Sequence, residues 1–184
     1  LLGCELMIES DGSGPPERIV LVAMNAAGYA NLRVLVSKAY TDTDERGVLS
    51  EAAVFARGDG LIVLSGGIRG HLWSMCEQKN TQALKDRIQK WRQVFGTRYY
   101  IELTRTGRPG EESALRQLVG AASELSVPIV ATNDAVFRST EDFEAHETRV
   151  CIHEGRGLDD PRRERRHSEQ QYLRSAEEML EVFA

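Results

Sequence analysis

Short apolar runs alternate along the chain with longer segments of helical periodicity. The runs are rich in β-branched residues, and each is bounded by glycine, proline or charged residues, which is typical of buried strands. They are residues 18–23, 60–64, 98–103 and 127–131, and residues 1–8 are a further expected strand. Residues 28–39, 81–95 and 111–125 have helical periodicity, and 142–152 and 175–183 form two further expected helices. This alternation predicts parallel strands joined by crossover helices, and therefore an α/β layered or barrel fold.

The beginning of the chain and its turns add to this picture. Residues 1–8 start without an initiator methionine, cap or turn, so we expect that the chain begins inside a strand and that part of the parent fold lies upstream. Five strands are few for a closed barrel, which agrees with that expectation. Residues 11–16 and 107–110 are expected turns, and Ser175 is an expected N-cap of the last helix.

Composition narrows the class of protein. The chain has 184 residues with 41% hydrophobic content, enough for a single core, so we expect one partial domain over residues 1–184. A net charge of -5 argues against binding nucleic acid through the overall field. Cys4, Cys76 and Cys151 are far apart and odd in number, so a reducing, cytoplasmic compartment is expected. No apolar run approaches the roughly 20 residues that span a bilayer, so no membrane association is expected.

Polar residues at the carboxyl ends of the expected strands are the first candidates for chemistry, because functional groups gather there in parallel α/β folds. These residues are Glu5, Asn25, Ser65–Gly67, Thr104–Thr106 and Thr132–Asp134. A carboxylate at Asp134 is suited to binding a divalent metal or to acting as a base, and the alternative is a turn or a helix cap. An acid such as Glu5 is costly to bury without a role, and the alternative is an edge-strand side chain in water.

Glycines and histidines provide weaker candidates. Ser65–Gly67 with Gly70 superficially resembles a phosphate cradle but matches no full phosphate-binding motif, so a tight turn into a helix is favoured. The four histidines have no spacing typical of a zinc site. His146 is expected on a helix as a packed or surface residue, and His153 and His167 are expected in solvated loops.

The region 162–166 contains four arginines, Arg162, Arg163, Arg165 and Arg166. They are able to contact DNA phosphates or an acidic partner. Glu164 interrupts the cluster and Glu169 follows it, which favours a solvated loop.

Six groups of residues, each unspecific alone, together resemble a known family. They are Gly3-Cys4-Glu5, residues 21–32 with 37–40, Leu64-Ser65-Gly66-Gly67, residues 101–103 with 106–109, residues 128–134, and Leu158-Asp159-Asp160-Pro161 with 172–179. In this order they resemble the polymerase-and-histidinol-phosphatase (PHP) domain of bacterial DNA polymerase III alpha subunits over nearly the whole chain. The resemblance implies a distorted TIM-like (β/α)7 barrel, of which this chain holds the later part.

The resemblance also implies a degenerate metal site. Intact members bind a trinuclear metal cluster through histidines, aspartates and a glutamate, and two of these positions are kept here as Glu5 and Asp134. Four others have changed to residues that are not typical ligands: Arg18, Gly67, Thr106 and Val136. The paired histidines of the family would lie upstream. Two carboxylates cannot hold such a cluster, so no metal cofactor is expected.

These matches imply a function in DNA replication. The parent chain is expected to be a DNA-directed DNA polymerase, a nucleotidyltransferase, whose catalytic aspartates lie outside these residues. This part is expected to be a metal-free domain that supports the rest of the alpha subunit and docks the proofreading exonuclease subunit, while DNA binds through the parent polymerase. Arg18 is expected to pair with Glu5 or Asp134, because a cation stabilises carboxylates left without a metal.

Three alternatives stay open. One is a phosphoesterase dependent on zinc, manganese or magnesium, acting as a 3'-5' exonuclease or pyrophosphatase. Another is a standalone α/β domain with a small-molecule ligand. The third is the error-prone alpha paralogue, although residues 158–161 and 172–175 favour the replicative form.

Overall fold

The computed structural model describes residues 1–9, 14–41 and 47–184. Part of the expected turn at residues 11–16 therefore lies outside the described residues. The chain divides into two compact units. The first unit comprises Leu1–Leu103 and Ser113–Val130, and the second comprises Thr104–Glu112 and Ala131–Ala184.

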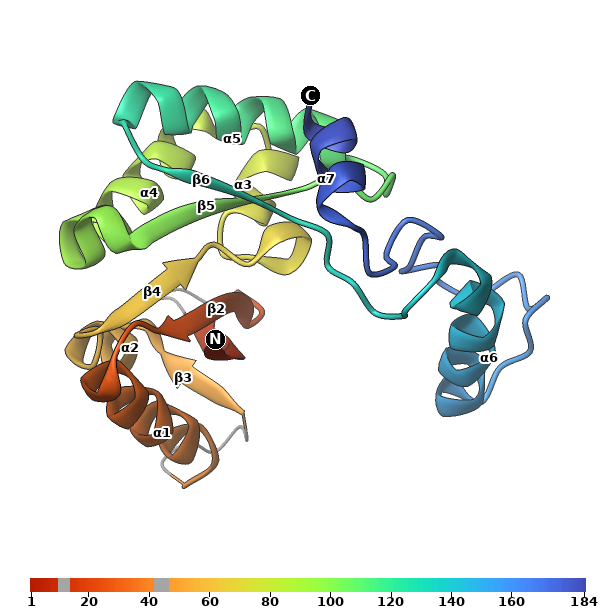
Figure 1. Cartoon of the computed structure of the whole chain (residues 1–184), viewed down its shortest axis with the longest axis horizontal. Helices are drawn as coiled ribbons and strands as arrows, with labels where there is room; N and C mark the ends of the chain where they lie inside the picture. The colour runs from red at the N-terminus through yellow and green to blue at the C-terminus, as the bar shows by residue number, and fades with distance from the viewer. Residues whose placement is uncertain (10–13, 42–46) are drawn as a thin grey trace. The chain divides into compact units, whose positions relative to one another are not determined.

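Within the described ranges, strands form one six-stranded sheet in the order β3-β1-β2-β4-β5-β6 (Figure 1). The strands are β1 (Leu2–Glu9), β2 (Glu17–Ala23), β3 (Val48–Ser50), β4 (Leu61–Leu64), β5 (Tyr99–Thr104) and β6 (Ile129–Thr132). The predicted α/β class is confirmed, and the sheet is mixed. β1 is parallel to β3 and β4 is parallel to β5, but β2 is antiparallel to both of its neighbours, β1 and β4.

The prediction of parallel strands throughout is therefore wrong for β2. Only residues 10–16 separate β1 from β2. A parallel pair needs a crossover of about a dozen residues or more, so a connection this short favours an antiparallel pair.

The predicted helices are confirmed to within two residues at each end. The observed helices are α1 (Ala26–Thr41), α2 (Glu51–Ala56), α3 (Trp73–Glu77), α4 (Thr81–Phe95), α5 (Glu111–Leu125), α6 (Phe143–Glu154) and α7 (Ala176–Phe183). Short 3-10 helices span Gly67–Arg69, Gly96–Arg98 and Thr140–Asp142. The sequence did not predict β3, α2 and α3, because elements of three to six residues are too short to show a period. The Ser175 cap is confirmed, since its hydroxyl accepts from the Glu178 N–H.

The first unit is built around an apolar core that also contains charge. The helices α4 and α5 lie side by side (Figure 1). An ion pair between Lys85 and Glu124, at 2.6 Å, joins them. Glu51, at the start of α2, is fully buried and accepts a hydrogen bond from the Trp91 indole at 2.8 Å. Arg87 approaches the same carboxylate to 3.0 Å, and Lys90 also contacts it. The buried acid is therefore neutralised by cations from α4.

His71 lies in the same core beside Trp91. Its Nε2 is 2.7 Å from the Tyr99 hydroxyl, and its ring meets the indole edge-on at 4.6 Å. Burial, with the nearby charge of Arg87, holds the pKa of His71 well below its ordinary value. Burial likewise raises the pKa of Tyr99 well above its own. The folded protein therefore keeps this imidazole neutral.

Stability is expected to depend on pH through His71. The unfolded chain protonates this side chain below about pH 6.5, whereas the folded chain does not, so the free energy of unfolding falls as pH drops below that value. The stabilisation is complete above about pH 6.5, and the loss reaches at most about 1.4 kcal/mol per pH unit. Denaturant titrations across this range, followed by tryptophan fluorescence, measure the slope.

Two variants test this prediction. In His71→Gln the slope between about pH 5 and pH 6.5 should be shallower by up to one protonation. In the control His153→Gln, where the parent side chain is exposed, the slope should stay that of the parent protein. Equal slopes in parent and His71→Gln would contradict the prediction.

Candidate functional site

Glu5 and Arg18 lie on adjacent strands of the first unit. Glu5 on β1 is opposite Val20, and Arg18 on β2 is opposite Met7, so the two charged residues are diagonal neighbours on one face. Arg18 Nη1 is 3.4 Å from Glu5 Oε1, which confirms the predicted pair. The Glu5 side chain is 62% exposed, so the pair contributes little to stability.

Arg18 also fixes the turn that follows β4. Its Nε donates to the Gly66 carbonyl at 2.8 Å. Gly66 has φ +89°, and a Cβ there would lie 2.2 Å from the Arg18 carbonyl oxygen, so only glycine fits. The turn leads into the 3-10 helix Gly67–Arg69, as the tight-turn interpretation predicted.

The Glu102 carboxylate already accepts a hydrogen bond from the backbone N–H that a phosphate would need. This N–H belongs to Gly66 and lies 3.0 Å from the buried carboxylate, which comes from β5. The backbone N–H of Glu102 donates to Ser65 Oγ at 2.9 Å. A carboxylate at this place repels an anion, so the contacts argue against a phosphate cradle. Glu102 was not predicted as a site residue, although an acid between the apolar residues Ile101 and Leu103 was a visible signal.

Two other candidates of the first unit have local structural roles. Asn25 Oδ1 accepts from the Gly28 N–H at 2.9 Å, so this side chain caps the start of α1. Gly67 has φ +60°, a left-handed conformation that favours glycine, and it offers no side-chain donor.

In the second unit, Asp134 is held by Arg108 and Gln171. Arg108 Nη2 lies 2.9 Å from Asp134 Oδ2, and Gln171 Nε2 donates to the same oxygen at 3.1 Å. Gln171 is fully buried and donates at 3.1 Å to the Asp134 carbonyl as well. Asp134 has φ +48°, so its backbone is in the left-handed region that non-glycine residues rarely adopt. Its carboxylate therefore already has a cation and an amide as partners.

Thr106 and Glu111 complete the surroundings of Arg108. Glu111 accepts from the Thr106 N–H at 2.7 Å and from the Thr106 hydroxyl at 2.9 Å. Arg108 Nε donates to the Thr106 hydroxyl at 2.8 Å, and its backbone N–H donates to Glu111 at 3.2 Å. Thr106 and Glu111 are buried, and only 10% of the Arg108 side chain is exposed. The guanidinium thus lies among two acids and a hydroxyl.

Val136 and Asn133 flank Asp134 and contact the later part of the chain. The Val136 N–H donates to the Gln171 carbonyl at 2.9 Å. Asn133 Nδ2 donates to the Gln170 carbonyl at 3.0 Å, and its Oδ1 accepts from Arg174 Nε at 3.1 Å. Both residues therefore attach the segment after β6 to residues 170–174.

The six positions that the resemblance assigns to the metal site offer few metal ligands in either unit. A divalent ion needs several nitrogen or oxygen ligands. Glu5 and Asp134 supply the carboxylates, and each of them faces an arginine of its own unit. Of the other four positions, Arg18 is a cation, Gly67 has no side chain and Val136 is apolar. The fourth is Thr106, whose hydroxyl is already hydrogen-bonded to Glu111 and Arg108.

The segment that follows α6 is attached to this helix by buried charges. Glu147 and Arg163 are in contact, and each side chain is only 6% exposed. Glu147 Oε1 is also 3.2 Å from His167 Nδ1. The prediction of solvated loop residues is therefore wrong for Arg163 and His167, because a buried acid needs charged or hydrogen-bonding partners. It holds for the exposed Arg162, which pairs with Asp160.

His146 lies on α6, as predicted, and His153 lies on the same helix, although a loop was predicted for it. His153 is exposed, so its predicted solvation is confirmed. Burial is the main cause that lowers the pKa of His146, and the neighbouring His167 and Arg149 lower it further.

Comparison with known proteins shows the family to which this chain belongs. A model of the PHP domain matches residues 1–106. Relatives named DNA polymerase III subunit alpha match over 100% of this chain; those of Pseudomonas fluorescens and Pseudomonas aeruginosa are 43% identical, and that of Escherichia coli K12 is 40% identical. The chain belongs to the PHP domain family. It spans 16% of the length of these curated relatives. Among the described helices, none has the length and apolarity needed to cross a membrane.

Arg108→Met is expected to destabilise the second unit. The change leaves Glu111 and Asp134 without this cation, and removing one partner of a buried ion pair costs about 3 kcal/mol or more. Amide hydrogen exchange at residues 131–136 should show opening that is easier by this amount.

The matched control is Arg116→Met, at an exposed position on α5. It should change the opening free energy by less than about 0.5 kcal/mol. An Arg108→Met protein that exchanges no faster than this control would show that the guanidinium is dispensable.

Proposed function

We propose that this chain is the PHP-domain part of the alpha subunit of a bacterial replicative DNA polymerase III, acting in DNA replication in the cytoplasm. Identity of about 40% over the whole chain to relatives with that name supports the proposal. Residues 1–184 then form part of a single PHP domain, a distorted TIM-like barrel whose remaining strands lie elsewhere in the parent protein. The six-stranded sheet with its helices is compatible with such a partial barrel.

In this proposal the domain is structural and metal-free at the six positions that the resemblance assigns to the metal site. The observation that carries it is the contact of Arg108 with Asp134. A bound divalent ion at this carboxylate would have to compete with a guanidinium that Thr106 and Glu111 also hold. The weaker contact of Arg18 with Glu5 places a second positive charge at the other retained acid.

The domain's partners follow from its place in the parent. It supports the rest of the alpha subunit, which is the DNA-directed DNA polymerase, and it docks the proofreading exonuclease subunit. DNA is bound by the parent polymerase. The net charge of -5 on this chain supports a protein partner in preference to direct phosphate binding.

A metal-dependent phosphoesterase is the competing function. The exposure of the Glu5 carboxylate favours it, because an accessible acid is available to a metal ion. Such an enzyme would use zinc, manganese or magnesium to activate water and to stabilise phosphoryl charge.

Metal analysis separates these two functions. The complete gene product, incubated with zinc or manganese and then desalted, should retain the same metal content as its Glu5→Gln/Asp134→Asn variant. Both proteins should hydrolyse a phosphodiester at the same background rate, as should the exposed-site control Glu112→Gln. Stoichiometric metal and hydrolysis that disappear only in the double variant would refute the metal-free domain and establish the phosphoesterase.

Docking of the exonuclease subunit is expected to protect amides within residues 1–184. Hydrogen exchange of the complete gene product, measured with and without the purified proofreading exonuclease subunit of the same organism, locates the contact. An unrelated acidic protein of similar size serves as the control and should protect none of these amides. Protection confined to residues outside this chain would contradict the docking role.

A further inference from the structure

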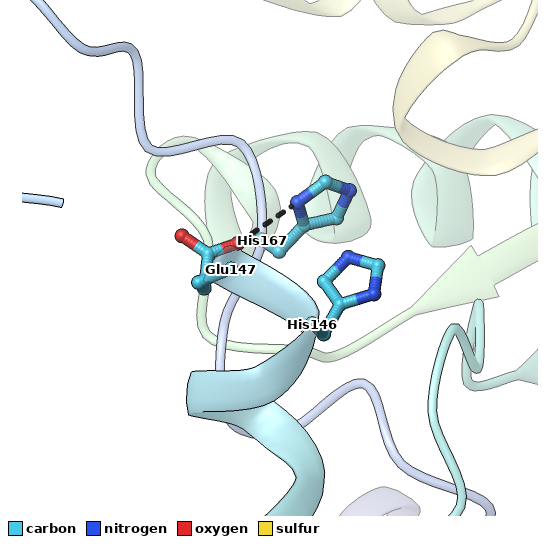
Figure 2. Close-up of side chains that lie close together, drawn as sticks. All are labelled: His146, Glu147 and His167. Atoms are coloured by element: carbon cyan, nitrogen blue, oxygen red, sulfur yellow. Dashed lines mark hydrogen bonds and ion pairs between the residues drawn. The ribbon is translucent and has the colours of Figure 1, made fainter. Parts of the chain in front are cut away.

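Two imidazoles and a carboxylate converge in the second unit, at the residues His146, Glu147 and His167. His146 and Glu147 lie on α6, and His167 comes from the segment that follows the helix (Figure 2). One ligand atom from each of the three lies within 4.8 Å of the others. The two imidazole rings meet edge to face at 4.6 Å. None of these residues is among the six metal-site positions considered above.

We propose that His146, Glu147 and His167 bind one divalent transition-metal ion of the zinc class. Two histidines and one carboxylate are a donor set that proteins use for zinc, with the fourth position left to water. Calcium and magnesium prefer sites made of oxygen ligands, so two nitrogen donors favour zinc over either.

The distances suit tetrahedral coordination. Zinc bonds of about 2.1 Å at tetrahedral angles place neighbouring ligand atoms about 3.4 Å apart. His167 Nδ1 and Glu147 Oε1 are 3.2 Å apart, so this pair already has the spacing of two ligands. The third donor, at no more than 4.8 Å, reaches the same spacing by an approach of about 1.4 Å or less, which rotation of the His146 side chain supplies.

His146 has a ring nitrogen available for a new bond. Its Nε2 is buried and has no hydrogen-bond partner among the residues that the structure describes. Its Nδ1 lies 3.3 Å from Arg149 Nη2. A buried nitrogen without a partner costs free energy, and a metal bond would recover that cost. The same ring lines a hollow of about 370 Å³, formed with Val136, Phe137, Arg138, Asp142, Ala145 and Arg149.

The charged groups around the three ligands affect how tightly the ion binds. Arg163 contacts the second oxygen of Glu147, so the carboxylate keeps one oxygen for the metal while the guanidinium orients it. Arg163 and Arg149 are both cationic and reduce the affinity below that of a neutral cluster. His167 loses its hydrogen bond to Glu147 when the ion takes that place, and any proton on Nδ1 is released.

Metal titration of the complete gene product tests the site. The protein is stripped with a chelator and titrated with Co²⁺, then with Zn²⁺ in competition. One Co²⁺ per chain with the strong visible absorption of tetrahedral coordination is expected, and Zn²⁺ should displace it. The absence of saturable binding, or only the weak absorption of octahedral Co²⁺, would overturn the proposal.

Three variants assign the ion to its ligands. His146→Asn and His167→Asn should each weaken binding at least about tenfold, and His153→Asn on the exposed part of α6 should leave it unchanged. Circular dichroism checks that each variant keeps its fold. Binding that survives both ligand substitutions would overturn the site. An ion lost only in Glu5→Gln/Asp134→Asn would overturn this site and the metal-free function together, whereas one lost only in the histidine variants supports this site and leaves that function intact.

Discussion

The contacts of the Arg108 guanidinium hold together the polar side chains around Asp134 in the second unit. This guanidinium touches Asp134 after β6, approaches Glu111 at the start of α5 and donates to Thr106 after β5. Buried carboxylates need cations or hydrogen-bond donors as partners, and this one arginine serves residues in two loops that are more than twenty residues apart. A guanidinium carried by the chain itself supplies that positive charge.

The same rule governs the first unit. Glu51 is buried against Arg87 and Lys90, and Glu102 is satisfied by the backbone of the turn after β4. Each acid is matched by a donor from an element distant in sequence. Asp134, which follows β6, fits this pattern because its carboxylate contacts Arg108. Glu5 is the exception because most of its side chain faces solvent.

The sequence predicted those features that depend on neighbouring residues along the chain. Periodicity located the long helices, and α4 and α5 have the predicted limits because their apolar stripes are long enough to be read. The orientation of β2 was wrong because the alternation of elements does not report the length of each connection. Arg18 with Glu5 was predicted because a family resemblance brought two distant positions together.

Arg108 with Asp134, and Glu147 with Arg163 and His167, could not be predicted in that way. The partners are between 16 and 26 residues apart, in segments without a common period. A pattern along the chain shows which face of an element is apolar, but it does not show which side chains meet once loops have closed. The same limit hid the role of Glu102, whose partner lies 36 residues away.

The buried hydroxyl of Thr106 has an evolutionary consequence. It fills a space bounded by Glu111 and Arg108, at a position where the resemblance implies a histidine in metal-binding members. An imidazole there would replace the hydroxyl that Arg108 and Glu111 share, and loss of the guanidinium would leave Glu111 and Asp134 without their common cation. A change at either position alone is therefore expected to lower stability, so substitutions at Thr106 and Arg108 should be tolerated best when they occur together.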